Sequence, residues 1–296
     1  MALLPGDTAL RVAIVNAAFC FLSIAPQVPA AGLQALIEGR GSPLVMLGGG
    51  TLGAAEFEPH AHVLAEHHRV IRLETINVER ARSQEPLPGG YSIRTESAAM
   101  ARTLDRLTID APLDLVGHSF GALVALDYAL DHPHRIHTLT LMEPPAFWVV
   151  PAGELQQSAG MRTMIELTRE LRPDRAPTDD QLMRFRCALG NCVEEPPRSR
   201  EPGADEWARR RSALRGLSAV AGHADDPDRL NTFRRPVLIM TGADTVSFHR
   251  RINDLLASRL PIVERIELPG GHGAPSSAPD AFTDALKAFL RRHQFD

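Results

Sequence analysis

The segment LDLVGHSFGALVAL, residues 113–126, contains a strand, a sharp turn and a helix in immediate succession. Residues 113–116 form an apolar strand, and a helix rich in small residues starts at Ala122. Between them lies the pattern Gly-X-Ser-X-Gly, with Ser119 flanked by Gly117 and Gly121. A side chain at either glycine would collide with the neighbouring strand or helix, and a turn this sharp strains the serine backbone. This setting is the one that a nucleophilic serine requires.

Apolar strands alternate with amphipathic helical stretches on both sides of this segment. We predict strands at residues 33–38, 43–47, 70–73, 113–116, 138–142, 237–241 and 263–268, and helices at 60–66, 95–107, 122–130, 250–260 and 279–292. The alternation indicates an α/β fold, with a mostly parallel central sheet and helices on both faces.

The composition changes after the strand at 138–142. Residues 148–226 contain no strong strand, several Pro and Gly breaks, and helical segments at 161–171, 179–189 and 207–220. We therefore predict a helical cap, or lid, inserted at 148–226 into a core formed by 1–147 and 227–296.

Composition excludes several classes of protein. The 296 residues are 44% hydrophobic and 23% charged, which is typical of a globular chain and not of a disordered or collagen-like one. The 32 Lys and Arg residues are dispersed among 36 Asp and Glu, and the net charge is −4. No basic stripe is present, so we expect no nucleic-acid partner.

The cysteines and the amino-terminal region indicate the cellular compartment in which we expect the protein. Cys20, Cys187 and Cys192 are too few for a disulfide framework or a four-ligand zinc site, which favours a reducing, cytoplasmic location. Residues 12–25 are apolar except for Asn16 and Ser23, but no basic region precedes them. A buried first strand or hairpin is therefore favoured over a secretory signal, and the stretch, which Asn16 interrupts and Pro26 ends, is too short to span a membrane.

The Gly-X-Ser-X-Gly turn with its strand and helix resembles the α/β-hydrolase family, and the resemblance extends from about residue 33 to residue 290, apart from the cap. In that family the nucleophile, the acid and the histidine follow one another in this order. The resemblance implies that Ser119 is the nucleophile and His272 its general base. His272 lies in LPGGHG, residues 268–273, and is the one histidine of 12 in a glycine-flanked turn after a late strand.

Two carboxylates compete for the third position of the triad. Family members usually place an aspartate after the penultimate strand as Gly-X-X-Asp, but in GADT, residues 242–245, Asp244 stands one residue early. Some relatives, haloalkane dehalogenases among them, carry the acid after the strand that follows the serine helix, where this chain has Glu143. A carboxylate that closes a buried strand also needs a partner, which His272 would supply. Both residues remain candidates.

The family also implies an oxyanion hole of two backbone N–H groups, which we assign to Phe120 and Gly50. The usual His-Gly of the second loop is replaced by Gly48-Gly49, so the loop position matches but the histidine is absent. Phe147 and Trp148 follow the candidate acid and either form an apolar wall of the substrate pocket or pack the cap onto the core.

A serine nucleophile favours an acyl-enzyme, and hence cleavage of an ester, thioester, lactone or amide, or acyl transfer. The cap carries 12 Arg and 13 Asp and Glu, which predicts a neutral or apolar small-molecule substrate. No metal and no cofactor are expected, because no cysteine or paired acid completes a metal shell around the histidines of residues 131–137. The alternatives are a cofactor-free lyase or oxygenase-type relative and a non-catalytic, ligand-binding protein of the same fold.

Overall fold

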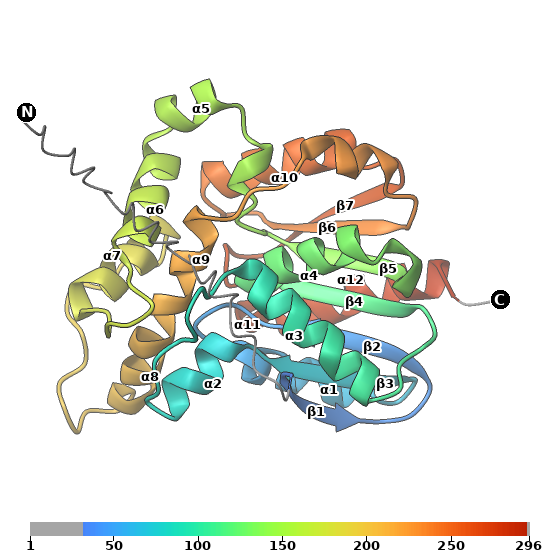
Figure 1. Cartoon of the computed structure of the whole chain (residues 1–296), viewed down its shortest axis with the longest axis horizontal. Coiled ribbons are helices and arrows are strands. Elements are labelled where there is room, and N and C mark those ends of the chain that lie inside the picture. Colours follow the sequence, from blue (N-terminus) through green and yellow to red (C-terminus); the bar gives the residue numbers. More distant parts are fainter. Residues whose placement is uncertain (1–31, 295–296) are drawn as a thin grey trace, which may run out of the picture.

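The computed structural model describes residues 32–294, and the stretch at 12–25 lies outside them. A seven-stranded sheet in the order β1-β3-β2-β4-β5-β6-β7 forms the centre of the protein (Figure 1). Strands β2 to β7 pair in parallel, and only the edge strand β1 runs antiparallel, against β3. The strands are β1 (Gln34–Glu38), β2 (Ser42–Leu47), β3 (His68–Glu74), β4 (Leu113–His118), β5 (Ile136–Met142), β6 (Val237–Gly242) and β7 (Val263–Leu268). The predicted α/β class is confirmed.

Helices cover both faces of this sheet because the central strands are apolar on both sides. On β2, Leu44 and Met46 face a cluster that includes Phe57 and Phe289, whereas Val45 and Leu47 face the larger cluster on the other side. The core helices are α1 (Glu58–Leu64), α2 (Ile76–Arg82), α3 (Ile93–Arg106), α4 (Phe120–Asp131), α10 (Ser247–Arg259), α11 (Ala274–Ser277) and α12 (Pro279–Arg292).

The segment between β5 and β6 is helical, and its helices stand beside one end of the sheet (Figure 1). They are α5 (Ala152–Gln157), α6 (Ala159–Glu170), α7 (Asp179–Ala188), α8 (Ala204–Leu214) and α9 (Ser218–Ala221). The expected single helix at 207–220 is divided into α8, a 3₁₀ turn and α9. Gly216 lies in this 3₁₀ turn and packs closely on α2, because a Cβ on this glycine would lie 2.3 Å from the Cβ of Asn77.

The cysteines differ from the expectation of unpaired thiols. Cys187 and Cys192 form a disulfide at the end of α7. Gly190 has a φ of 81°, and the turn that it permits brings the two Cα atoms to 3.9 Å. The two cysteines are five residues apart and lie on either side of a turn that follows a helix. The number of cysteines alone does not predict this pairing.

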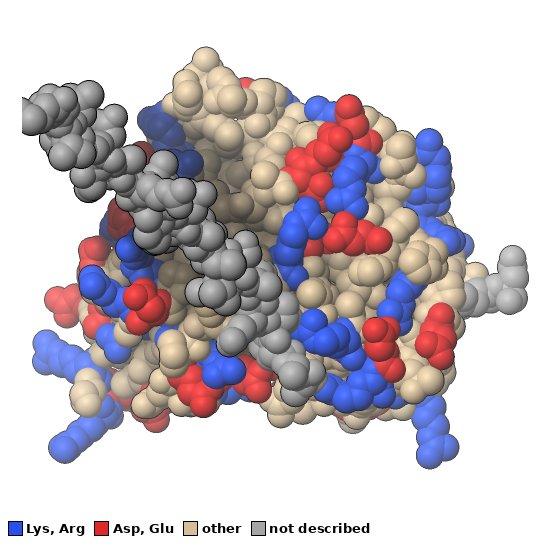
Figure 2. Space-filling model, viewed as in Figure 1, with Lys and Arg blue, Asp and Glu red and all other residues tan. Residues whose placement is uncertain are grey.

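The surface carries charges of both signs in close proximity. On the face shown in Figure 2, the Lys and Arg side chains alternate with Asp and Glu side chains. Within residues 32–294, no helix is both long and apolar enough to cross a bilayer.

Candidate active site

The turn between β4 and α4 presents Ser119 in a strained conformation. Ser119 has φ 52° and ψ −121°, in a region that residues with a side chain rarely adopt. The flanking glycines allow the tight packing around this turn, since a Cβ on Gly117 would lie 2.4 Å from the Cα of Ala122. A Cβ on Gly121 would lie 2.3 Å from the carbonyl oxygen of Leu47. The two glycines therefore have the steric role that the sequence predicts.

Three predicted residues from distant parts of the chain form one hydrogen-bonded relay. His272 Nε2 lies 2.9 Å from Ser119 Oγ, and His272 Nδ1 lies 2.7 Å from Glu143 Oε2. Glu143 and His272 are buried, whereas Ser119 is half-buried at the edge of a cavity. This arrangement has the geometry of a serine activated by an oriented imidazole.

The structure brings Glu143 to the histidine and leaves Asp244 apart. Glu143 also accepts hydrogen bonds from the Gly242 N–H and from Thr245 Oγ1, each at 2.8 Å. Asp244 is exposed, and its carboxylate makes no hydrogen bond with His272. Thr245 holds the fourth position of the Gly-X-X-Asp pattern, so the side chain after β6 orients the acid instead of supplying it.

The pKa shifts of Glu143 and His272 favour the protonation states that general-base catalysis needs. Burial disfavours the charge of Glu143, but the hydrogen bond from His272 and the nearby imidazoles outweigh burial and lower the pKa of Glu143 to about 2. Burial lowers the pKa of His272, although Glu143 partly offsets this shift. Near neutral pH the pair is therefore a carboxylate and a neutral imidazole, which can accept the serine proton.

The two predicted oxyanion donors lie next to each other beside Ser119. A Cβ on Gly50 would be 2.9 Å from the Cβ of Phe120. Phe120 is the first residue of α4, where backbone N–H groups have no acceptor within the helix. Asn77 fixes the loop, because its Nδ2 donates to the Gly50 carbonyl at 2.6 Å and to the Ala213 carbonyl of α8 at 3.0 Å.

Comparison with known proteins identifies the family of this chain. The model of the alpha/beta hydrolase fold family matches residues 42–277. The chain belongs to the alpha/beta hydrolase family. It is 27% identical to the uncharacterized hydrolase YraK of Bacillus subtilis (strain 168) over 281 residues, which cover 90% of this chain and 96% of YraK.

Two solved structures share the fold of this alpha/beta hydrolase. A thermophilic esterase from Thermogutta terrifontis superposes with a TM-score of 0.63 at 19% identity, over 89% of this chain and 94% of the esterase. The enol-lactonase from Burkholderia xenovorans LB400 superposes with a TM-score of 0.59 at 20% identity, over 88% of this chain and 96% of the lactonase. At this level of identity the two likenesses describe the fold.

A buried ion pair next to His272 was not predicted. His118 Nδ1 lies 2.8 Å from Glu56 Oε1, and His118 Nε2 donates to the carbonyl of His272 at 2.8 Å. Burial opposes both charges, yet each partner favours the charge of the other, so the pKa of Glu56 is lowered and that of His118 is raised. The pair holds the loop of His272 in this alpha/beta hydrolase. His118 stands within the Gly-X-Ser-X-Gly pattern, but the sequence gives no signal that connects it with Glu56.

A second buried histidine that was not predicted, His249, stacks on His272. The rings of His249 and His272 are 4.3 Å apart and inclined by 10°. Burial and the neighbouring His272 lower the pKa of His249 well below its usual range. Glu143, His249 and His272 are the one group of described residues with ligand-type atoms close enough to hold a metal ion, within 4.8 Å of one another. Their proximity is explained by the stacking and by the His272–Glu143 hydrogen bond.

Ser119 lines two spaces between the sheet core and the helices that join β5 to β6. The larger one has a volume of about 220 Å³ and a mixed lining that includes Gly50, His272, Arg186 and Arg210. The smaller one, of about 20 Å³, is mostly apolar, and its lining includes Met164, Leu189, Leu217, Val220 and Phe248. Phe147 and Trp148 line neither space. Phe147 packs behind the wall, with its ring 6.0 Å from that of Phe248.

Proposed function

We propose that this alpha/beta hydrolase cleaves a carboxylic ester, thioester or lactone through an acyl-enzyme on Ser119. The observation that carries the proposal is the relay from Ser119 Oγ through His272 to Glu143, with successive separations of 2.9 and 2.7 Å. A serine hydroxyl is a poor nucleophile near neutral pH unless an oriented base removes its proton.

In the first half of the reaction, Ser119 Oγ attacks the carbonyl carbon while its proton passes to His272 Nε2. Glu143 stabilises the imidazolium through Nδ1. The carbonyl oxygen becomes an oxyanion, and the N–H groups of Gly50 and Phe120 stabilise its charge. The intermediate collapses as Nε2 returns the proton to the leaving alcohol or thiol.

In the second half, water replaces the leaving group. His272 takes a proton from this water, the hydroxide attacks the acyl carbon, and Ser119 leaves with the proton that Nε2 returns. The products are a carboxylic acid and an alcohol or thiol, or a hydroxy acid when the substrate is a lactone. Each step uses groups of this chain and water.

A labelling reaction tests the proposal. The purified protein would be treated with a fluorophosphonate, and the adduct located by mass spectrometry, beside a panel of p-nitrophenyl esters. We expect one adduct, on Ser119, and ester hydrolysis that Ser119→Ala abolishes. A folded protein that is neither labelled nor active on any ester would overturn the acyl-enzyme mechanism and favour the ligand-binding alternative. Ester turnover that survives in Ser119→Ala would place the reaction elsewhere.

A further inference from the structure

Two arginines of the cap face the same cavity as the catalytic serine. Arg186, near the end of α7, and Arg210, in α8, line the 220 Å³ space together with Ser119 and His272. The only acidic residue of that lining is Glu56, whose charge is balanced by the buried His118. The cavity wall therefore carries an excess of positive charge.

Arg186 has no counter-charge within residues 32–294. Its Nε is buried and makes no hydrogen bond, and its guanidinium makes no ion pair with any described carboxylate. Its one distinctive contact is with the ring of Trp207, whose centroid lies 5.9 Å from the guanidinium carbon. A cation that is partly removed from water without a partner is costly, so a cavity that keeps one is suited to an anion.

Arg210 adds to this positive potential. Its Nε lies 2.6 Å from Glu206 Oε1, but Glu206 also binds Arg209 at 2.8 Å, so one carboxylate serves two arginines. Burial, followed by the repulsion from Arg210, lowers the pKa of Arg186. The two guanidinium groups are therefore close enough to repel one another.

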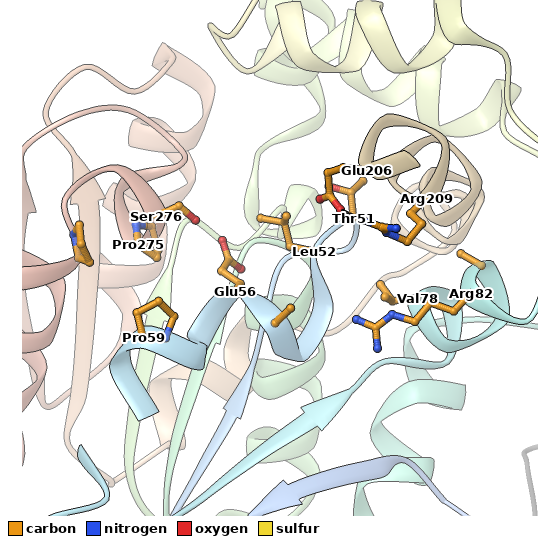
Figure 3. A pocket seen from close by; sticks show the side chains of 13 residues that line it. Thr51, Leu52, Glu56, Pro59, Val78, Arg82, Glu206, Arg209, Pro275 and Ser276 are labelled. Atoms are coloured by element: carbon orange, nitrogen blue, oxygen red, sulfur yellow. Dashed lines mark hydrogen bonds and ion pairs between the residues drawn. The ribbon is translucent and has the colours of Figure 1, made fainter. Parts of the chain in front are cut away.

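A neighbouring cleft, shown in Figure 3, differs from the cavity of Ser119 in the pairing of its arginines. It shares Thr51, Leu52, Glu56 and Ser276 with the catalytic cavity and also contains two arginines. There, however, Arg82 pairs with Glu74 at 2.6 Å, and Arg209 pairs with Glu206. Of the four arginines that line these two cavities, Arg186 is the one without a carboxylate partner.

We infer that Arg186 and Arg210 form a subsite for a carboxylate of the substrate, so that the hydrolase acts on a carboxylate-bearing ester, thioester or lactone. The planar guanidinium fork matches a carboxylate. The cavity must also hold the scissile group, which favours a carboxylate over the bulkier phosphate. The inference rests on the proposed hydrolase function. It departs from the neutral substrate that the balanced charge of the cap predicts.

Matched ester pairs test the subsite from both sides of the scissile bond. On the acyl side, p-nitrophenyl valerate is compared with mono-p-nitrophenyl glutarate, which replaces the terminal methyl by a carboxylate. On the leaving-group side, phenyl butyrate is compared with 4-carboxyphenyl butyrate. The rate without enzyme is subtracted in each case. We expect at least one pair to favour the charged ester by about tenfold or more in kcat/KM.

Arg186→Gln and Arg210→Gln should each reduce this charged-to-neutral ratio by about 10-fold to 100-fold, because each removes a charge-assisted contact. Arg184→Gln is the matched control, since Arg184 lies on α7 two residues before Arg186 but pairs with Glu170 and lines a different pocket, and it should leave the ratio unchanged. Raising the salt concentration should lower the wild-type ratio. Ratios near one in both pairs would overturn the subsite while leaving the hydrolase function intact.

A binding measurement separates failure of the subsite from failure of the hydrolase function. Glutarate should raise the Tm of the wild-type protein and have a smaller effect on the Tm of Arg186→Gln, whether or not esters are cleaved. Inorganic phosphate serves as the competing anion, and a larger effect of phosphate than of glutarate would contradict the carboxylate assignment. No Tm change with glutarate, together with ratios near one, would reject the subsite. Absence of fluorophosphonate labelling would instead reject the proposed function.

Discussion

The acid of the relay is Glu143, held by three donors at the end of β5. We predict that Glu143→Gln lowers kcat by about 10⁴-fold, because a neutral amide neither fixes the catalytic tautomer nor stabilises the imidazolium. Asp244→Asn, on an exposed side chain, should change kcat by less than about twofold. Steady-state kinetics on one ester, with circular dichroism to verify folding, measure both. Equal and mild losses in the two variants would contradict the assignment.

The protonation state of His272 sets the pH dependence. Burial lowers its pKa below the usual 6.5, and the base must be neutral to accept the serine proton. We therefore expect kcat/KM to fall as the pH drops below that lowered pKa and to be constant from about pH 7 to 8. A pH–rate profile in buffers of constant ionic strength measures this. If the acidic limb of the profile gave a pKa above 6.5, the charge of Glu143 would outweigh burial in setting the pKa of His272.

At the scale of elements, α2 joins the core to the cap. Asn77 of α2 donates one hydrogen bond to the Gly50 loop and another to the last turn of α8, and it packs against Gly216. The N-terminus of α2 is held in turn by Glu96 of α3, which accepts from the N–H groups of Ile76 and Asn77. Asn77 is therefore one of the ties between these helices and the core, beside Arg215, which donates to the Arg80 carbonyl at 3.1 Å.

We predict that Asn77→Ala lowers the free energy of unfolding by about 1–3 kcal/mol, because two buried carbonyls lose their donor. It should also lower kcat, since the loop that carries Gly50 becomes mobile. Denaturant unfolding and ester kinetics measure the two effects. Asn231→Ala is the control, because Asn231 is exposed and its amide contacts only Asp228. An Asn77→Ala variant with wild-type kcat would mean that the Gly50 loop does not depend on this tie.

At the scale of the whole molecule, we expect the packing of helices α5 to α9 against the core to limit the size of the substrate. The apolar space beside Ser119 has a volume of about 20 Å³, with Met164 of the cap on one side and Phe248 of the core on another. We predict that p-nitrophenyl acetate is preferred over the hexanoate by about 1000-fold or more in kcat/KM, because the hexanoate carries four more methylenes and each one that does not fit costs about 1–3 kcal/mol.

The variant Met164→Ala should reduce this discrimination by enlarging the apolar space, whereas Val63→Ala, exposed on α1 outside both cavities, should not. Rising kcat/KM with chain length in the wild-type protein would show that the cap opens to admit longer acyl groups.

Much of the fold follows from local pattern. The apolar strands, the amphipathic helices and the Gly-X-Ser-X-Gly turn are specified by residues within one element, so all seven strands and most core helices were predicted near their observed bounds. Ser119 and His272 were predicted for the same reason, since each stands in a turn with its own sequence signature. The short helices α2, α5 and α11 were missed, because four to seven residues show too little periodicity.

The remaining features depend on contacts between residues far apart in the chain. The choice of Glu143 over Asp244, the Glu56–His118 pair and the stacking of His249 on His272 each join segments that no local pattern relates. The charge of the cap is balanced in the sequence, yet the fold pairs Arg82 and Arg209 with carboxylates and leaves Arg186 without one. Backbone periodicity is read from neighbouring residues, whereas burial and electrostatic pairing exist only after distant segments have packed together.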